Sequence, residues 1–379
     1  MRQTPAMRRI WLLLVALALL LTACAGDAPL DTLEPEGPAA RTIDNLLNGV
    51  LVPAAIVFVF VEGGILWLAW RYRAGRRRTE GDEDDEDDIP AQTHGNLILE
   101  IAWTAVPALM LGGVAVFTVG AIFDLADEPE DAMQVEVIGQ QWWWEFRYDT
   151  DDDGEVDIVT ANEMVVPAGT PIDLDITSRD VIHSFWIPAL NGKLDAVPGR
   201  HHDLTIEADE PGIYWGQCTE FCGLSHANMR MRTVALSPEE FDEWVDNQLE
   251  PAVAPETAAQ QSGQDFFVAQ CGTCHQINGV NDVEEADLVA GSAPNLTHLM
   301  SRSTFAGSIF RLYEEADDED LDYLALPDLG TLDRAQLEAW LRDPPGLKPM
   351  DPDDRRGMPN FNLSEDQIDQ LVDYLSTLR

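Results

Sequence analysis

The chain has 379 residues, with 68 acidic against 23 basic side chains, so its formal net charge is −45. Such a chain has no basic face for a nucleic acid, and a nucleic-acid-binding function is excluded. The acidity is typical of proteins that water and salt keep in solution at high salinity; a docking face for a basic partner is the alternative.

Residues 1–23 have the three parts of a signal peptide. Arg8 and Arg9 precede an apolar run over 10–21, and small residues then lead to Cys24. The ending Leu21-Thr-Ala-Cys24 resembles a bacterial lipobox, which implies that Cys24 becomes the lipidated N-terminus of the mature chain. An uncleaved membrane anchor is the alternative. Processing is favoured because it leaves no unexplained thiol in an oxidising compartment.

Residues 24–130 contain two further apolar runs, at about 50–70 and 97–123, and each meets the length of ~20 residues that a bilayer requires. Five arginines between Arg71 and Arg78 place the connecting loop in the cytoplasm. The acidic run over 82–88 does not reverse this orientation, because acids contribute little to it. We therefore predict a two-helix transmembrane hairpin in the bacterial cell membrane, with both chain ends on the outer side.

Residues 131–248 change to short segments of alternating polarity. Examples lie at 134–138, 171–177 and 202–207, with turns rich in Gly and Pro between them. This spacing predicts an all-β sandwich or barrel.

Within this region, the segment Cys218-Thr-Glu-Phe-Cys222-Gly-Leu-Ser-His226-Ala-Asn-Met229 gathers soft metal ligands. Thiolate, imidazole and thioether together favour copper over hard cations. The second cysteine, four residues after the first, offers a second bridging thiolate and therefore predicts a two-copper centre. A disulfide between the two cysteines and a zinc site completed by His183 are the alternatives. Zinc leaves Met229 unexplained, since a thioether is a poor ligand for that ion.

Residues 249–262 are rich in Ala, Pro and Gln and predict a linker that tethers the last domain yet lets it reorient. The remaining residues, 263–379, predict helices at 265–270, 334–342 and 364–378. A capping box at Ser364 and Gln367 marks the start of the last one.

The segment Cys271-Gly-Thr-Cys274-His275 is the C-x-x-C-H motif of covalent haem c attachment. The two thiols bind the haem vinyl groups and the histidine binds the iron. We expect a methionine as the sixth ligand, with Met358 preferred and Met350 as the competitor. His298 is a weaker alternative, expected at the surface or beside a haem propionate.

The pattern C-x-E-x-C-x3-H-x2-M resembles the CuA loop of cytochrome c oxidase subunit II. The segment Asp180-Val-Ile-His183-Ser-Phe-Trp-Ile-Pro188 resembles the part of that family that supplies the remote histidine. Together with the cytochrome c segment, the chain is similar to subunit II of a caa3-type oxidase. The resemblance implies a cupredoxin-like Greek-key sandwich and an all-α class I cytochrome c domain, in a multidomain membrane protein. The implied CuA ligands are His183, Cys218, the Glu220 backbone carbonyl, Cys222, His226 and Met229.

Three further roles are implied by the same resemblance. The Glu220 side chain would face a magnesium shared with subunit I. Trp142, in the run Trp142-Trp143-Trp144, falls where electrons arrive from cytochrome c, while core packing is the expected role of Trp144. Since three adjacent indoles in a strand cannot all face one core, at least one is expected to be exposed. Glu100 stands where the family has a carboxylate at the mouth of a proton channel; an interfacial residue that reaches water is the alternative.

The resemblance implies an electron relay from an external donor, such as cytochrome c, through haem c and CuA to haem a of subunit I. The chain has seven histidines, too few to build the oxygen-reducing centre as well, so haem a3 and CuB would lie on subunit I, with subunit III as a further partner. Oxygen reduction and proton translocation would follow there. A copper-delivery or storage module has no use for a covalent haem. A protein like nitrous oxide reductase would not need the membrane hairpin, and a quinol oxidase subunit would lack Cys218 and Cys222.

Overall fold

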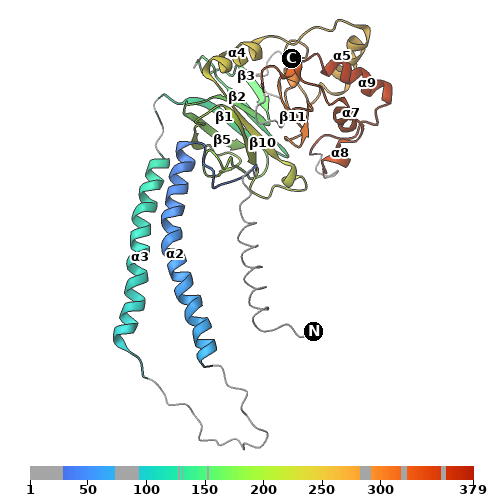
Figure 1. The fold of residues 1–379 in the computed structure, drawn as a ribbon. Coiled ribbons are helices and arrows are strands. Elements are labelled where there is room, and N and C mark those ends of the chain that lie inside the picture. Colours follow the sequence, from blue (N-terminus) through green and yellow to red (C-terminus); the bar gives the residue numbers. More distant parts are fainter. Residues whose placement is uncertain are drawn as a thin grey trace, which may run out of the picture. The chain divides into compact units, whose positions relative to one another are not determined.

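The computed structural model describes residues 29–72, 94–126, 129, 131–151, 153–281, 292–316, 322–350 and 356–379. The predicted signal peptide, Cys24 and most of the arginine-rich loop lie outside these residues. The chain divides into two compact units, of which residues 41–129 form one and the residues on either side form the other (Figure 1).

The first unit consists of two long apolar helices, α2 (Pro38–Arg71) and α3 (Leu97–Leu125). Both are long and apolar enough to cross a membrane, as predicted from the runs at 50–70 and 97–123. Asn96 caps α3, because its side-chain oxygen accepts hydrogen bonds from the backbone N–H groups of Ile98 and Leu99. Large apolar side chains are exposed along both helices, which suits a lipid environment.

The second unit begins with a β-sandwich, which confirms the predicted all-β class. Its larger sheet has the order β3-β2-β1-β5-β8, in which β1 pairs with β2 antiparallel and with β5 parallel. Its smaller sheet has the order β4-β10-β9. The strands of the larger sheet are β1 (Met133–Gln140), β2 (Trp143–Tyr148), β3 (Ile158–Ala161), β5 (Ile172–Ser178) and β8 (His202–Ile206). Those of the smaller sheet are β4 (Glu163–Pro167), β9 (Gly212–Gln217) and β10 (Arg230–Leu236).

Two short strands and one helix complete the sandwich. The strands β6 (His183–Phe185) and β7 (Leu194–Ala196) form a ribbon of their own, and α4 (Pro238–Leu249) follows β10. Fully buried side chains such as Val137, Phe146 and Leu174 fill the core between the sheets. The packed sheets thereby hold the loops after β5 and β9 in place.

The C-terminal part is mainly helical, as predicted. Its helices are α5 (Ala258–Gln270), α6 (Leu326–Leu329), α7 (Arg334–Arg342), α8 (Pro344–Leu347) and α9 (Glu365–Leu375), and β11 (Thr304–Phe305) pairs with β12 (Phe310–Arg311). α5 packs closely on α9, since a Cβ on Gly263 would lie 2.1 Å from the carbonyl oxygen of Gln370. Only glycine permits this approach.

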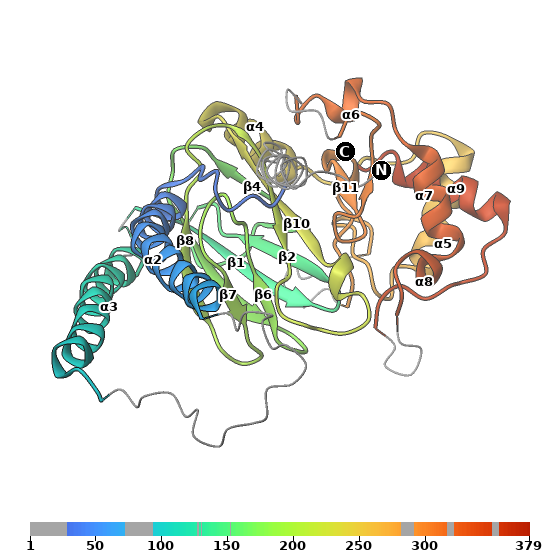
Figure 2. The ribbon, with the colours of Figure 1, turned by 60° about the horizontal axis from the view of Figure 1, so that its bottom comes forward.

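The predicted linker over 249–262 is too long. Thr257 and Gln260 form a capping box, so α5 begins at Ala258, inside the expected linker. In Figures 1 and 2, α5, α7, α8 and α9 gather on one side of the β-sandwich. The structure therefore has a docked C-terminal part where composition predicted one free to reorient.

Candidate functional site

The two cysteines of the predicted copper loop lie side by side. Cys218 follows the end of β9, and its Sγ is 3.8 Å from that of Cys222. Both thiols are buried and free, and their separation is far longer than the ~2.05 Å of a disulfide bond. Cys218 and Cys222 therefore do not form a disulfide in this structure.

His183 reaches the same point from β6, a different part of the chain. Its Nδ1 lies 3.9 Å from the Sγ of Cys218, and its ring is fully buried. Its Nε2 lies 2.9 Å from a carboxylate oxygen of Asp180. That second contact fixes the orientation of the ring, as the partners of metal-bound histidines commonly do.

The remaining predicted donors complete the cluster. His226 Nδ1 is 3.5 Å and Met229 Sδ is 3.8 Å from the Sγ of Cys222. The backbone oxygen of Glu220 is 3.4 Å from the Sγ of Cys218. Sulfur, imidazole and carbonyl donors thus converge from one loop and one strand, and this donor set fits copper.

The electrostatics of the cluster favour an ionised ligand. The contact with Cys222 lowers the pKa of Cys218 and at the same time raises that of Cys222. Burial lowers the pKa of His183, but the hydrogen bonds to Asp180 and Cys218 outweigh it, and the resulting pKa is raised. Burial raises the pKa of Asp180, yet its hydrogen bonds, led by that to His183, bring it below 3.8. A thiolate and a carboxylate are therefore present at neutral pH.

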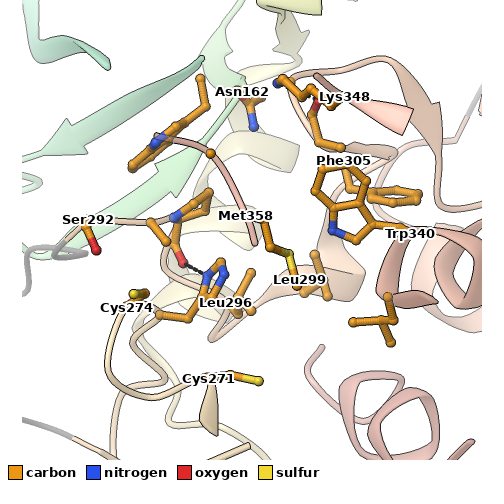
Figure 3. Close-up of a pocket in the computed structure, with 18 of the residues that line it drawn as sticks. Asn162, Cys271, Cys274, Ser292, Leu296, Leu299, Phe305, Trp340, Lys348 and Met358 are labelled. Atoms are coloured by element: carbon orange, nitrogen blue, oxygen red, sulfur yellow. Dashed lines mark hydrogen bonds between the residues drawn. The ribbon is translucent and has the colours of Figure 1, made fainter. Parts of the chain in front are cut away.

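A cavity of about 310 Å³ opens beside this cluster, in the C-terminal part. Its lining includes Cys271, Cys274, His275 and Met358, and Figure 3 shows Cys271, Cys274 and Met358 around the same space. Of the two candidate methionines, Met358 lines the cavity among the described residues and Met350 does not. The residues of the haem motif and the preferred sixth ligand are thus brought together.

The geometry of His275 suits an iron ligand. Its Nδ1 lies 2.8 Å from the carbonyl oxygen of Pro294, so a hydrogen bond orients the ring and leaves Nε2 for the metal. Burial lowers the pKa of His275, which favours the neutral form that binds iron.

Arg302 also lines the cavity and is almost fully buried. One of its terminal nitrogens donates to the Asn295 carbonyl oxygen at 2.6 Å, while its Nε has no partner among the described residues. A buried guanidinium with an unused donor fits an anionic group in the cavity, as a haem carboxylate would be. The apolar lining, which includes Trp340 and Phe305, fits the rest of a haem.

The expected surface position of His298 is wrong. The residue is 4% exposed, and its two ring nitrogens contact the carbonyl oxygens of Arg379 and Glu250. It therefore holds the C-terminus against the end of α4.

The expectation that one of the three tryptophans is exposed is also wrong. Trp142, Trp143 and Trp144 are 3%, 6% and 0% exposed. Trp144 lies in the core against His183, whereas Trp142 and Trp143 line the cavity of the C-terminal part. The docked domain buries what a free sandwich would expose.

Trp142 connects the two sites. Its indole Nε1 donates a hydrogen bond to the Cys222 carbonyl oxygen at 3.0 Å, and its ring borders the cavity. Its own carbonyl oxygen accepts a hydrogen bond from Lys348 of the C-terminal part at 2.6 Å. The aromatic residue chosen from the sequence thus lies between the copper loop and the haem cavity.

Several functional residues were not singled out from the sequence. Asp180 stands three residues before His183, and this short spacing could have indicated that its carboxylate orients the imidazole. Lys348 and Arg302 have no local signal, because their partners are distant in the chain. Arg356 belongs to the same group, with a guanidinium nitrogen 3.9 Å from Asp180.

Glu100 lies in the first turn of α3, on the membrane unit, and is exposed. Its proposed role in proton uptake stays a prediction. The Glu220 side chain, within the copper loop, is likewise exposed.

Three protein-family profiles match the chain. The transmembrane domain of cytochrome c oxidase subunit II matches residues 35–120, its periplasmic domain matches 153–235, and cytochrome c matches 260–379. The periplasmic domain of subunit II of cytochrome oxidase from Bradyrhizobium japonicum is a similar solved structure, with 32% identity and a TM-score of 0.30, covering 32% of this chain and 95% of that one.

Two relatives match over nearly the whole length. Cytochrome c oxidase subunit 2 of Alkalihalophilus pseudofirmus is 34% identical over 373 residues, covering 96% of this chain and 95% of the relative. Its counterpart in Bacillus sp. strain PS3 is 31% identical, covering 98% and 97%. With the copper-loop donors and the haem motif in one chain, these matches show that the protein belongs to the family of cytochrome c oxidase subunit 2, carries a C-terminal cytochrome c domain, and is a subunit of a haem-copper oxidoreductase.

Proposed function

We propose that this chain is the electron-relay subunit of a caa3-type cytochrome c oxidase. Electrons would pass from an external donor to covalently attached haem c, then to a binuclear CuA centre, and then to haem a of subunit I. Oxygen would be reduced to water there, at haem a3 and CuB, and protons would be translocated.

One observation carries this proposal. Trp142 borders the cavity that holds Cys271, Cys274, His275 and Met358, and its indole is hydrogen-bonded to the carbonyl of Cys222. A short bonded path therefore leads from the haem site to the copper loop within one chain.

The side chains have separate tasks in this relay. When bound, the haem and the copper pair supply carriers that each accept and release one electron. Cys271 and Cys274 would attach the haem, and His275 and Met358 would bind its iron. The copper pair would be held by His183, Cys218, Cys222, His226, Met229 and the Glu220 carbonyl. The burial of His183, Cys218, Cys222 and Met229, together with the Asp180 contact, holds these donors in one arrangement, which limits rearrangement when the charge changes.

The surroundings of the relay follow from the same family. The two helices would anchor the chain in the cell membrane, with the copper and cytochrome domains on the periplasmic side. Subunits I and III would be the partners within the complex, and cytochrome c or another periplasmic protein the donor. The Glu220 side chain would bind a magnesium shared with subunit I, Glu100 would lie at a proton-uptake channel, and Cys24 would carry a lipid.

The test is flash reduction of haem c in the purified oxidase, followed by optical detection of copper reduction. We expect a rate that does not change with protein concentration, because donor and acceptor share one chain. Trp142→Ala should slow the transfer. Trp244→Ala is a matched control, since this buried indole packs on Tyr148 and lies off the path. A rate proportional to concentration would refute the intramolecular relay, and equal rates in the two variants would remove Trp142 from it.

A further inference from the structure

A buried carboxylate of the copper domain is bound entirely by groups of the cytochrome domain. Glu163, the first residue of β4, is 0% exposed. Its oxygens accept hydrogen bonds from the Ser303 backbone N–H at 2.8 Å, the Ser303 hydroxyl at 2.7 Å, the Thr304 hydroxyl, and the Tyr323 hydroxyl at 2.8 Å. A carboxylate has about four acceptor positions, so its capacity is filled from across the domain boundary.

A buried cation stands next to this carboxylate. Arg232 of β10 is the backbone partner of Glu163 across the smaller sheet and is 1% exposed. Its Nη1 donates to the Ser303 hydroxyl at 2.9 Å and to the Ala316 carbonyl oxygen at 3.0 Å, and its guanidinium stacks on Trp215. The copper domain therefore presents an anion and a cation to the same segment of the cytochrome domain.

Buried charged groups of this kind specify geometry. Their hydrogen bonds are satisfied in one arrangement only, and a shifted one would leave a charge buried without a partner. Further contacts agree with a single arrangement, since Gln248 donates to Ser301 at 3.0 Å and the Arg230 backbone N–H donates to the Gly307 carbonyl at 3.1 Å. Hydrogen bonds thus cross the domain boundary at residues on either side of Ser303 in the sequence.

We propose that Glu163 is a positioning residue that fixes the cytochrome domain against the copper domain in one orientation. An electron then crosses at a constant separation and needs no diffusive search by a tethered domain. This inference rests on the proposed electron relay. It differs from a flexible tether in one measurable way, because diffusive search slows in a viscous solvent and transfer in a fixed arrangement does not.

The experiment uses the complete oxidase with Glu163→Ala and the conservative Glu163→Gln. Glu145→Gln is the matched control, because Glu145 is also 0% exposed but is held by Arg147 and Arg179 of its own domain. Haem-to-copper transfer is measured after a flash at increasing glycerol concentration. Hydrogen exchange of the peptide that contains Ser303 is measured in parallel, with copper and haem content checked in every variant.

We expect wild-type transfer to be independent of viscosity. Glu163→Ala should make the rate fall in proportion to viscosity and should accelerate exchange at Ser303 about ten- to a hundredfold, from the loss of hydrogen bonds to a charged group. Glu163→Gln should have effects between those of the wild type and Glu163→Ala, since its amide oxygen still accepts hydrogen bonds. Glu145→Gln should change neither the viscosity dependence nor the exchange at Ser303. If Glu163→Ala does not fold, the same two measurements on Glu163→Gln test the inference.

Two results would overturn the inference. One is a wild-type rate that falls with viscosity; the other is unchanged exchange and viscosity dependence in both Glu163 variants. Failure of the relay itself looks different. The transfer rate would then scale with protein concentration. The Ser303 peptide would still be protected from hydrogen exchange in the wild type and lose that protection in Glu163→Ala. The positioning role of Glu163 would in that case stand without the relay.

Discussion

Replacing Gly139 by alanine should displace the imidazole of the copper site and leave the fold in place. Gly139 lies in β1, directly beneath His183. An alanine Cβ would lie 2.8 Å from Cδ2 and 3.1 Å from Cγ of that ring, and 3.2 Å from the Trp144 ring. Both rings are fully buried, so neither can turn away into solvent.

The size of the displacement follows from these distances. Restoring an ordinary contact of 3.4 Å from 2.8 Å requires the imidazole to move by about 0.6 Å. Metal–ligand distances tolerate only ~0.2 Å. We therefore expect copper affinity to fall by about 10–100-fold, the range seen when the orientation of a ligand is disturbed. Overpacking itself should cost about 1–3 kcal/mol of unfolding free energy.

Copper content per chain, the copper EPR hyperfine pattern and the thermal midpoint are the measurements. Gly216→Ala is the control, because its Cβ would lie 2.9 Å from Ile187 and Met231, whose aliphatic side chains can adjust. It should lower the midpoint similarly and leave the copper spectrum unchanged. If Gly139→Ala kept the wild-type copper content and hyperfine pattern and lost only thermal stability, the reasoning about the imidazole would be refuted.

Three further predictions concern separate parts of the chain. Met358→Ala should abolish the near-infrared charge-transfer band of a thioether-ligated haem and lower its potential, and Met350→Ala should change neither; the reverse outcome would exchange the two assignments. Asp180→Asn should lower copper affinity about 10–100-fold in a competition titration, and equal affinity would contradict its orienting role. Because the pKa of Asp180 is lowered below 3.8 in the folded chain, its carboxylate stabilises the fold above pH 3.8, and this stabilisation is lost as the pH falls through the pKa of the folded state. The stability of Asp180→Asn should therefore depend less on pH in this acid range. Asp203→Asn should raise the thermal midpoint at low salt, because Asp175 lies directly opposite and facing like charges cost ~0.2–1 kcal/mol of unfolding free energy. The gain should vanish in about 1 M salt, where the screening length is ~3 Å.

Local patterns were sufficient for much of the molecule. The helix predicted at 334–342 is α7, and the apolar run starting at 97 is α3. Most of the copper donors fall within the twelve residues from Cys218 to Met229, so their meeting point needed little knowledge of the fold. His183 was found only through the resemblance, since the strand that carries it is separate from the loop.

Contacts between domains could not be predicted in this way. Glu163 is one of 68 acidic residues, and nothing near it in the sequence distinguishes it from an exposed one. Its partner Ser303 lies 140 residues away. The same packing explains why none of the three tryptophans is exposed, since Trp142 and Trp143 line the cavity of the C-terminal part, and why His298, which contacts Glu250 at the end of α4, is buried.

The strong negative charge makes this packing consequential. At high salt, attraction between exposed charges is screened within ~3 Å, so surface charge steers a separate donor poorly. Glu163 and Arg232 are excluded from solvent, and their hydrogen bonds are screened far less. A cytochrome domain carried on the same chain and held by buried groups keeps its position at salt concentrations that would weaken a docking face of exposed acids. Buried groups thus hold the two domains together in a way that depends little on the salt concentration of the solvent.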